Sequence, residues 1–453
     1  MSSIKVIVSD LHLADGHPIF DGFTEASQAA FEGLLAAAGT AGPLGKADDV
    51  ELIINGDGFD FLATPPYDTG ETIDIATALE KMQLIAAAHQ PFFEALGAFL
   101  AQPGHHVTII TGNHDIELRF AEIRAAITRT IGCEPDDARL SFCPTRFYQP
   151  APDIAIEHGN QYDFWNRTLP GIWDEQGQPL DLHPQRLALC PGSRYFQHSA
   201  LALSLNYPYF DHLEPSINIL RQMALLCLLN PALVRETVRH AIELMPEPRQ
   251  ALANLAPEEE NIPSRLFQEA MLDFLAFQQD MERLFGKPGA TSPDNNQAQA
   301  NTMMEYMMLL ETLKLPLSEA IAAVCTPATY QMGENVARGM HLLLSEQPAL
   351  RYAVAGHTHM VRIDPINNGQ QSYLNTGSWT IRVAPPAPGE VTPALIEWLR
   401  KPDWSAIPLR DVSQRIFIVV ESKSDEKQVQ QTPSSATLCV WEGGRNGNYK
   451  VLA

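Results

Sequence analysis

The segment Ile4-Lys-Val-Ile-Val-Ser-Asp-Leu-His12 decides which fold this sequence predicts. Its first five residues are apolar and β-branched apart from Lys5, which is typical of a buried strand. Asp10 and His12 follow this run directly. Ligand sites of layered α/β proteins form where strands end. The segment therefore predicts a central strand that delivers a carboxylate and an imidazole to such a site.

Five further apolar runs end in a polar cluster in the same way. They span residues 50–54, 107–111, 154–157, 352–355 and 372–375. Helical patterns at residues 23–38 and 73–101 separate the early runs. Strands that alternate with helices indicate a layered α/β or αββα architecture.

The polar clusters at these strand ends combine carboxylate, imidazole and amide groups, a set that suits Mn²⁺, Fe or Zn²⁺ better than Ca²⁺. Any one of them alone is a weak signal, because a single Asp-x-His is usually a solvated pair. Their order along the chain, each after a strand, indicates a metal site. The clusters are residues 10–12, 56–60, 112–115, 158–160 and 356–359.

The composition of the 453 residues fits a packed protein, with 45% hydrophobic and 19% charged residues. A net charge of −23 repels phosphate backbones, so we expect no nucleic-acid partner. The six scattered cysteines include no CxxC pair and predict free thiols. The first residues run straight into a strand without a signal sequence, and no apolar run is long enough to cross a membrane. We expect a cytoplasmic protein.

Long helical patterns rich in Met and Leu occupy residues 166–349. We expect this region to be a helical insertion or lid, and residues 1–165 and 350–453 to form the core, with C-terminal strands at 415–420 and 436–441. The lid reading implies a bulky or amphipathic substrate and allows peripheral contact with a membrane. The alternative interpretation is that the Met and Leu residues, which recur at helical spacing, only build a helical core. Residues 286–301 and 421–435 are predicted loops.

In order, spacing and context, these motifs resemble those of the calcineurin-like metallophosphoesterase superfamily. The resemblance covers residues 1–165 and about 350–382, and it implies an αββα sandwich that holds two divalent metal ions. By this resemblance Asp10, His12, Asp57 and His359 bind one ion. Asp57, Asn113, His158 and His357 bind the other, with Asp57 bridging.

The same resemblance assigns catalysis to His114 and Asp60. His114 matches the catalytic histidine, and Asp60 resembles the acidic partner that fixes its ring. Two ions that share a water lower its pKa and clamp phosphoryl oxygens, so a bridging hydroxide can attack phosphorus. His114 then protonates or stabilises the leaving oxygen. The segment 375–379 resembles the closing turn of the family and predicts support for the site.

The motif Gly56-Asp-Gly-Phe-Asp-Phe-Leu62 indicates which phosphoester is cleaved. Phosphoprotein phosphatases of the superfamily carry Arg-Gly where this chain has Phe61 and Leu62. The motif is closer in style to the UDP-2,3-diacylglucosamine pyrophosphatase-like branch, which implies a phosphodiesterase or pyrophosphohydrolase acting on a nucleotide- or lipid-linked substrate. Candidate substrate contacts are Arg167, Arg194 and His198. The alternatives are a nuclease of the same superfamily and a catalytically silent binding scaffold.

Overall fold

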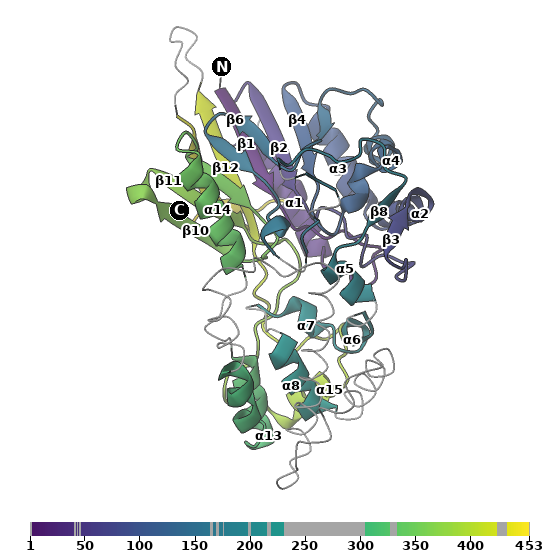
Figure 1. Ribbon diagram of the computed structural model, residues 1–453, viewed down its shortest axis with the longest axis vertical. Helices are drawn as coiled ribbons and strands as arrows, with labels where there is room; N and C mark the ends of the chain where they lie inside the picture. Colours follow the sequence, from purple (N-terminus) through teal and green to yellow (C-terminus); the bar gives the residue numbers. More distant parts are fainter. Residues whose placement is uncertain are drawn as a thin grey trace. The chain divides into compact units, whose positions relative to one another are not determined.

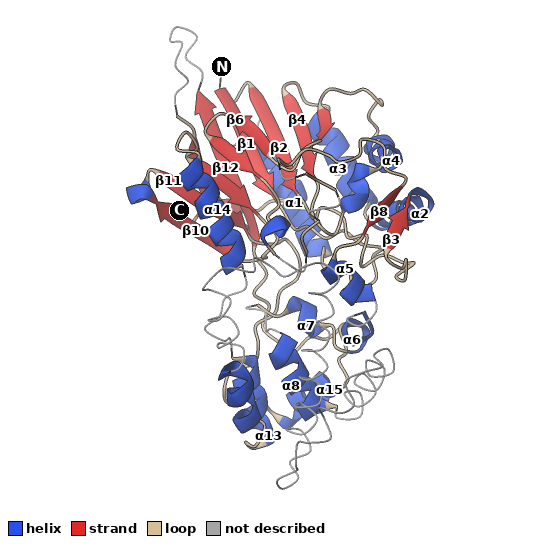
Figure 2. Ribbon diagram, viewed as in Figure 1, coloured by secondary structure: helices blue, strands red, loops and turns tan. Residues whose placement is uncertain are grey.

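The structure is a computed structural model. It describes residues 2–39, 42, 44, 47–163, 166–168, 172–174, 176–197, 201–214, 219–230, 304–326, 333–423 and 433–452. It is a mixed α/β protein with parallel and antiparallel sheets, as predicted (Figure 2). None of the described helices is long and apolar enough to cross a membrane.

The larger sheet has seven strands in the order β14-β13-β12-β1-β2-β4-β5. β1, β2, β4 and β5 run parallel to one another, and β12 pairs antiparallel with β1. Helices connect these parallel strands. The strands are β1 (Ser2–Val8), β2 (Asp49–Asn55), β4 (His105–Ile110), β5 (Leu140–Phe142), β12 (Arg415–Lys423), β13 (Ser435–Glu442) and β14 (Asn448–Val451).

The second sheet has five strands in the order β10-β11-β9-β7-β6. β9 lies at its centre and runs parallel to both β7 and β11. The strands are β6 (Tyr148–Ala151), β7 (Ile154–Ile156), β9 (Tyr352–Ala355), β10 (Val361–Ile366) and β11 (Gln371–Thr376). A separate pair, β3 (Thr72–Asp74) and β8 (Arg186–Ala188), is antiparallel.

The two sheets pack face to face because their strands are apolar on both sides. Ile7 of β1 and Ile53 of β2 share one hydrophobic cluster with Ile156 and Val354 of the second sheet. Their neighbours on the opposite face, such as Val6, instead pack against helices. Helices therefore cover the outer face of each sheet (Figure 1). Those helices are α1 (Glu25–Ala38), α2 (Ile75–Ala88), α3 (Gln90–Leu100) and α4 (Ala121–Ile131) on one side and α14 (Glu334–Glu346) on the other.

The predicted strands match observed ones in position, but one predicted helix is divided. Residues 73–101 form the end of β3 and two helices, α2 and α3, with a break at His89. His89 has non-helical backbone angles, and Pro91 is the second residue of the next helix, in the first turn where proline is tolerated. The predicted helices and loops within residues 231–303 and 424–432 lie outside the described residues.

The chain divides into two compact units whose limits differ from the predicted ones. The first comprises residues 1–201, 332–381 and 413–453, and the second comprises residues 202–331 and 382–412. Residues 334–346 belong to the first unit because α14 buries Val336 and Met340 on its sheet. Residues 382–412 join the helical unit instead, because their apolar side chains enter its core.

The second unit is helical in its described part, with a core of Leu, Ala and aromatic residues. Leu225 and Ile321 are fully buried, and Leu395 and Leu399 pack in the same cluster. Its helices are α6 (Leu201–Asn206), α7 (Tyr209–His212), α8 (Ile219–Leu229), α13 (Leu317–Cys325) and α15 (Pro393–Arg400), and residues 304–312 are also helical.

Arg221 is a buried charge in the described part of this unit, and its removal should destabilise the unit. Its guanidinium pairs with Glu305 (Nε to Oε1, 2.7 Å) and donates to the carbonyls of Ala323, Val324 and Thr326 at the end of α13. Removing one partner of a buried ion pair leaves the other charge buried and unpaired, here that of Glu305. Arg221→Met should therefore lower the free energy of unfolding by about 3–5 kcal/mol. Thermal and urea unfolding followed by circular dichroism measures this.

The control is Arg400→Met in the same unit, where the arginine makes an exposed pair with Glu397. That variant should change stability by less than about 1 kcal/mol. Equal effects of the two substitutions would show that the Arg221 network contributes no more than a surface pair.

Candidate metal centre

The candidate ligands lie where the strands of both sheets end, and their backbones are joined there. The pairing of β1 with β2 continues past both strands, because Asp10 N–H donates to Gly56 O (3.2 Å) and His12 N–H to Asp57 O (2.9 Å). On the second sheet Gly356 N–H donates to His158 O (2.9 Å). His357 N–H then donates to the Asp10 carboxylate (3.0 Å), which links the two sheets.

Asp10, His12 and His359 form the first group of side chains that could hold a metal ion. His12 Nε2 lies 3.0 Å from His359 Nε2, and His359 Nε2 lies 3.3 Å from Asp10 Oδ1. His12 Nδ1 faces Asp60 Oδ2 at 2.9 Å. Because a carboxylate only accepts, His12 Nδ1 donates to Asp60, and Nε2 is the ring atom that faces the group.

Asp57, His158 and His357 form the second group. His158 Nε2 lies 3.0 Å from Asp57 Oδ2, and His158 Nδ1 donates to Asn55 O at 2.9 Å. Nε2 of His158 is therefore the ring atom that faces the carboxylate oxygen, and such a pair of atoms binds a proton or a cation between them. The structure thus has His and Asp groups that could hold a metal ion.

Asn113 Oδ1 supports the fit of a cation to the second group. This oxygen is buried and has no hydrogen-bond partner among the described residues. A buried polar atom without a partner is costly and calls for an explanation such as a bound ion. The residues on either side of Asn113 both contact Asp57. His114 N–H donates to Asp57 Oδ1 (2.9 Å), and Gly112 lies against the same carboxylate.

The backbone at the candidate ligands is strained. Seven non-glycine residues in the described ranges have φ in the left-handed region, and five of them are candidate ligands. Such a residue costs about 1–3 kcal/mol and persists where its surroundings over-determine it, which is common at active sites. The five are Asp10 (52°), His12 (51°), Asp57 (49°), His357 (68°) and His359 (56°).

Two glycines allow close approaches between these loops. A Cβ on Gly112 would lie 2.1 Å from Asp57 Oδ1, and one on Gly356 would lie 2.4 Å from Asp10 Oδ2. No side chain fits at either position without moving a carboxylate. The glycines in Gly-Asn-His-Asp and Gly-His-Thr-His are therefore part of the geometry of the site.

Asp60 connects the first group to His114. Its Oδ1 lies 3.0 Å from His114 Nδ1, and its Oδ2 contacts His12. The side chain of His114 is 27% exposed, whereas that of Asp60 is 7% exposed. With Nδ1 held by Asp60, His114 has Nε2 free for a molecule in the site. The contact of Asp60 with His12 was not foreseen from the sequence.

The carboxylates of the site attract positive charge. Burial opposes protonation of His114, but the charges of Asp60 and Asp57 outweigh it and raise the pKa of His114 to about 10. Burial also opposes protonation of His158, and Asp57 raises its pKa to about 9. Burial, together with the charge of Asp57, raises the pKa of Asp10. Protons and metal ions compete for such a site.

Residues without a predicted role hold the candidate ligands in place. Asp163 Oδ2 lies 3.1 Å from His357 Nε2, and Asn55 Nδ2 donates to the carbonyl of Glu157 (3.0 Å) beside His158. Ser9 Oγ donates to Asp10. These residues lack a sequence signal of their own beyond being polar near a motif. In the 375–379 segment, Ser378 and Trp379 both donate to Asp10 O, so the segment contacts the site.

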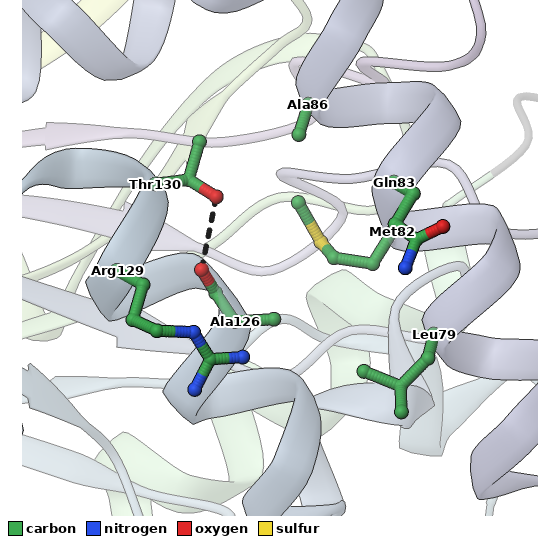
Figure 3. Close-up of a pocket in the computed structure, with 7 residues that line it drawn as sticks. All are labelled: Leu79, Met82, Gln83, Ala86, Ala126, Arg129 and Thr130. Atoms are coloured by element: carbon green, nitrogen blue, oxygen red, sulfur yellow. Dashed lines mark hydrogen bonds between the residues drawn. The ribbon is translucent and has the colours of Figure 1, made fainter.

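Two of the three candidate substrate contacts, Arg167 and Arg194, lie within the described residues. Arg194 makes an ion pair with Glu71 (2.5 Å), and Arg167 N–H donates to Asp163 O (2.9 Å). His198 lies outside the described residues. A shallow pocket of about 280 Å³ between α2 and α4 contains none of the candidate ligands (Figure 3). It is lined by Leu79, Met82, Gln83, Ala86, Ala126, Arg129 and Thr130.

Gly112→Ala should weaken metal binding, because the added Cβ displaces the Asp57 carboxylate. We expect at least a tenfold loss of Mn²⁺ affinity, comparable with the loss of a supporting contact, measured by titration calorimetry. The control is Gly444→Ala, where a Cβ would meet only Ala29 at an ordinary 3.6 Å. Unchanged Mn²⁺ binding in Gly112→Ala would contradict the assignment of Asp57.

Comparison with known proteins gives no match that bears on the site. No protein-family model matches the chain, and no curated protein matches it. What the structure establishes is two neighbouring groups of His and Asp side chains that could each hold a metal ion, with a third group of His12, Asp60 and His114 beside them. The chemistry of these groups is the basis for a functional proposal.

Proposed function

We propose that this chain is a metal-dependent phosphoester hydrolase of the calcineurin-like metallophosphoesterase type, with two divalent cations (Mn²⁺, Fe or Zn²⁺) at the strand ends. One cation would be held by Asp10, His12, Asp57 and His359, and the other by Asp57, Asn113, His158 and His357. The observation that carries the proposal is the division of these acceptor side chains into two adjacent groups on strained backbone.

Asp57 is the residue that would be shared by both cations. Its Oδ2 lies 3.0 Å from His158 Nε2 in one group and 3.9 Å from His12 Nε2 in the other. Two divalent cations in such a site supply the charge that polarises a phosphoryl group and lowers the pKa of water. The chain itself holds the acceptor atoms at a fixed separation and keeps Asp57 between them.

His114 would act on the leaving group. Asp60 holds its Nδ1, so the ring is fixed in one orientation and Nε2 is the atom that can donate a proton to the departing oxygen. Its partial exposure makes it accessible to a substrate, in contrast to the buried Asp60. The charge of Asp60 favours the protonated ring that this role requires.

The residue after Asp60 is Phe61, which favours a diester or pyrophosphate substrate over a phosphoprotein. Phe61 is fully buried and faces away from solvent, so no cation stands there to bind a phosphoserine. The substrate is proposed to be nucleotide- or lipid-linked, by resemblance of the Gly56–Leu62 motif to the UDP-2,3-diacylglucosamine pyrophosphatase-like branch. The net charge of −23 disfavours a nucleic acid as the substrate.

The purified protein should hydrolyse bis(p-nitrophenyl) phosphate with Mn²⁺ present. Activity should vanish on treatment with a chelator and return when Mn²⁺ is added back, because the acceptor groups alone cannot polarise phosphorus. Release of p-nitrophenolate measures the rate, and elemental analysis measures metal content. Protein that carries about two ions per chain and shows no activity towards this diester, phosphomonoesters or nucleotide sugars would contradict the proposal.

His114→Ala should separate catalysis from metal binding. We expect turnover to fall by about 10²–10⁴-fold, the usual contribution of a general acid, with metal content unchanged. Asp57→Ala is the comparison, since loss of the shared carboxylate should release both ions. Loss of metal in His114→Ala, or retention of one ion in Asp57→Ala, would show that the roles are assigned incorrectly.

A further inference from the structure

Lys81 is a buried cation in the middle of an apolar helix face. The buried stripe of α2 consists of Ala78, Met82 and Ile85, which follow helical spacing. Lys81 belongs to the same stripe and is 1% exposed. An apolar residue is expected at such a position, because an isolated buried ammonium is costly. The lysine therefore needs a compensating role in the interior.

The ammonium group of Lys81 holds the peptide that follows Asp60. Lys81 Nζ donates to Phe61 O at 2.7 Å. The N–H of the same residue, Phe61, donates to His114 O at 3.1 Å. Phe61 is thus fixed on one side by the backbone of His114 and on the other by Lys81. Asp60 precedes it directly, so this contact bears on the carboxylate that orients the His114 ring.

The charge of Lys81 also acts on Asp60. Burial lowers the pKa of the Lys81 ammonium, while the carboxylates of Glu117 and Asp60 favour its charged form. Glu117 is 1% exposed, and its Oε2 has no hydrogen-bond partner among the described residues. The attraction between the charges of Lys81 and Asp60 adds to the backbone contact at Phe61.

We propose that Lys81 is a positioning residue for the His114–Asp60 pair: it fixes the Asp60–Phe61 peptide and balances the Asp60 carboxylate, so that His114 points its Nε2 at the leaving group. This inference rests on the proposed phosphoester hydrolysis. Among the described residues, Lys81 makes its hydrogen bond to Phe61 and not to a candidate ligand, so its effect on turnover would pass through Asp60. Metal binding should not depend on it.

The test compares two diesters that differ in how much they need a proton on the leaving oxygen. Bis(p-nitrophenyl) phosphate releases a weakly basic phenolate, whereas diphenyl phosphate releases a more basic one. Lys81→Met removes the donor and the charge at similar length. We expect kcat to fall about tenfold or more on diphenyl phosphate and less than about threefold on bis(p-nitrophenyl) phosphate, with KM and metal content unchanged.

The control is Lys5→Met, which removes another largely buried lysine that pairs with Asp49 and Glu51 on the same sheet. It should lower both rates equally or leave them unchanged. If circular dichroism shows Lys81→Met to be unfolded, Lys81→Gln, which keeps a donor without the charge, takes its place with the same selective loss expected.

An equal loss on both substrates, or a loss of bound metal, would overturn the role of Lys81, since a structural defect does not distinguish leaving groups. A wild-type protein without activity on either diester would instead contradict the hydrolase itself. The two failures are therefore told apart by the wild-type rates.

Discussion

The carboxylates of Asp10 and Asp57 are buried close together, and most of the surrounding structure serves to hold them there. Burial and the neighbouring charge raise the pKa of Asp10, so two ionised acids at this place require positive charge beside them. Imidazoles from both sheets supply directed nitrogen atoms, and His158 contacts Asp57 at 3.0 Å. A cluster of acceptors of this kind is stable only where protons or cations balance it.

The two packed sheets provide the rigidity that this arrangement needs. Strands such as β1 and β2 are buried on both faces, so their register cannot slip without exposing apolar side chains. The loops that follow these strands are anchored by them, and Asp10, His12 and Asp57 in these loops have unfavourable positive φ values. The energy of packing in the sheets thus sustains local strain at the strand ends.

Asp60 gives the neighbouring imidazoles different environments. By holding Nδ1 of both His12 and His114, it directs Nε2 of the first into a metal group and leaves Nε2 of the second available to a substrate. Lys81 and the backbone of His114 in turn fix the peptide after Asp60. One buried carboxylate therefore couples the metal groups to the residue proposed for proton transfer.

The sequence alone determined the α/β class, the order of the strands along the chain and the residues at the candidate site. It did so because apolar periodicity and polar strand ends are local properties, readable at Asp10, Asp57 and His357 without knowledge of the fold. The limits of the two units could not be predicted from the sequence, because residues 382–412 join the helical core only through long-range packing. Likewise Asp163, Asn55 and Lys81 acquire their contacts from segments distant in the chain. Only the tertiary structure decides such contacts, because they depend on which strand ends and helix faces meet in space.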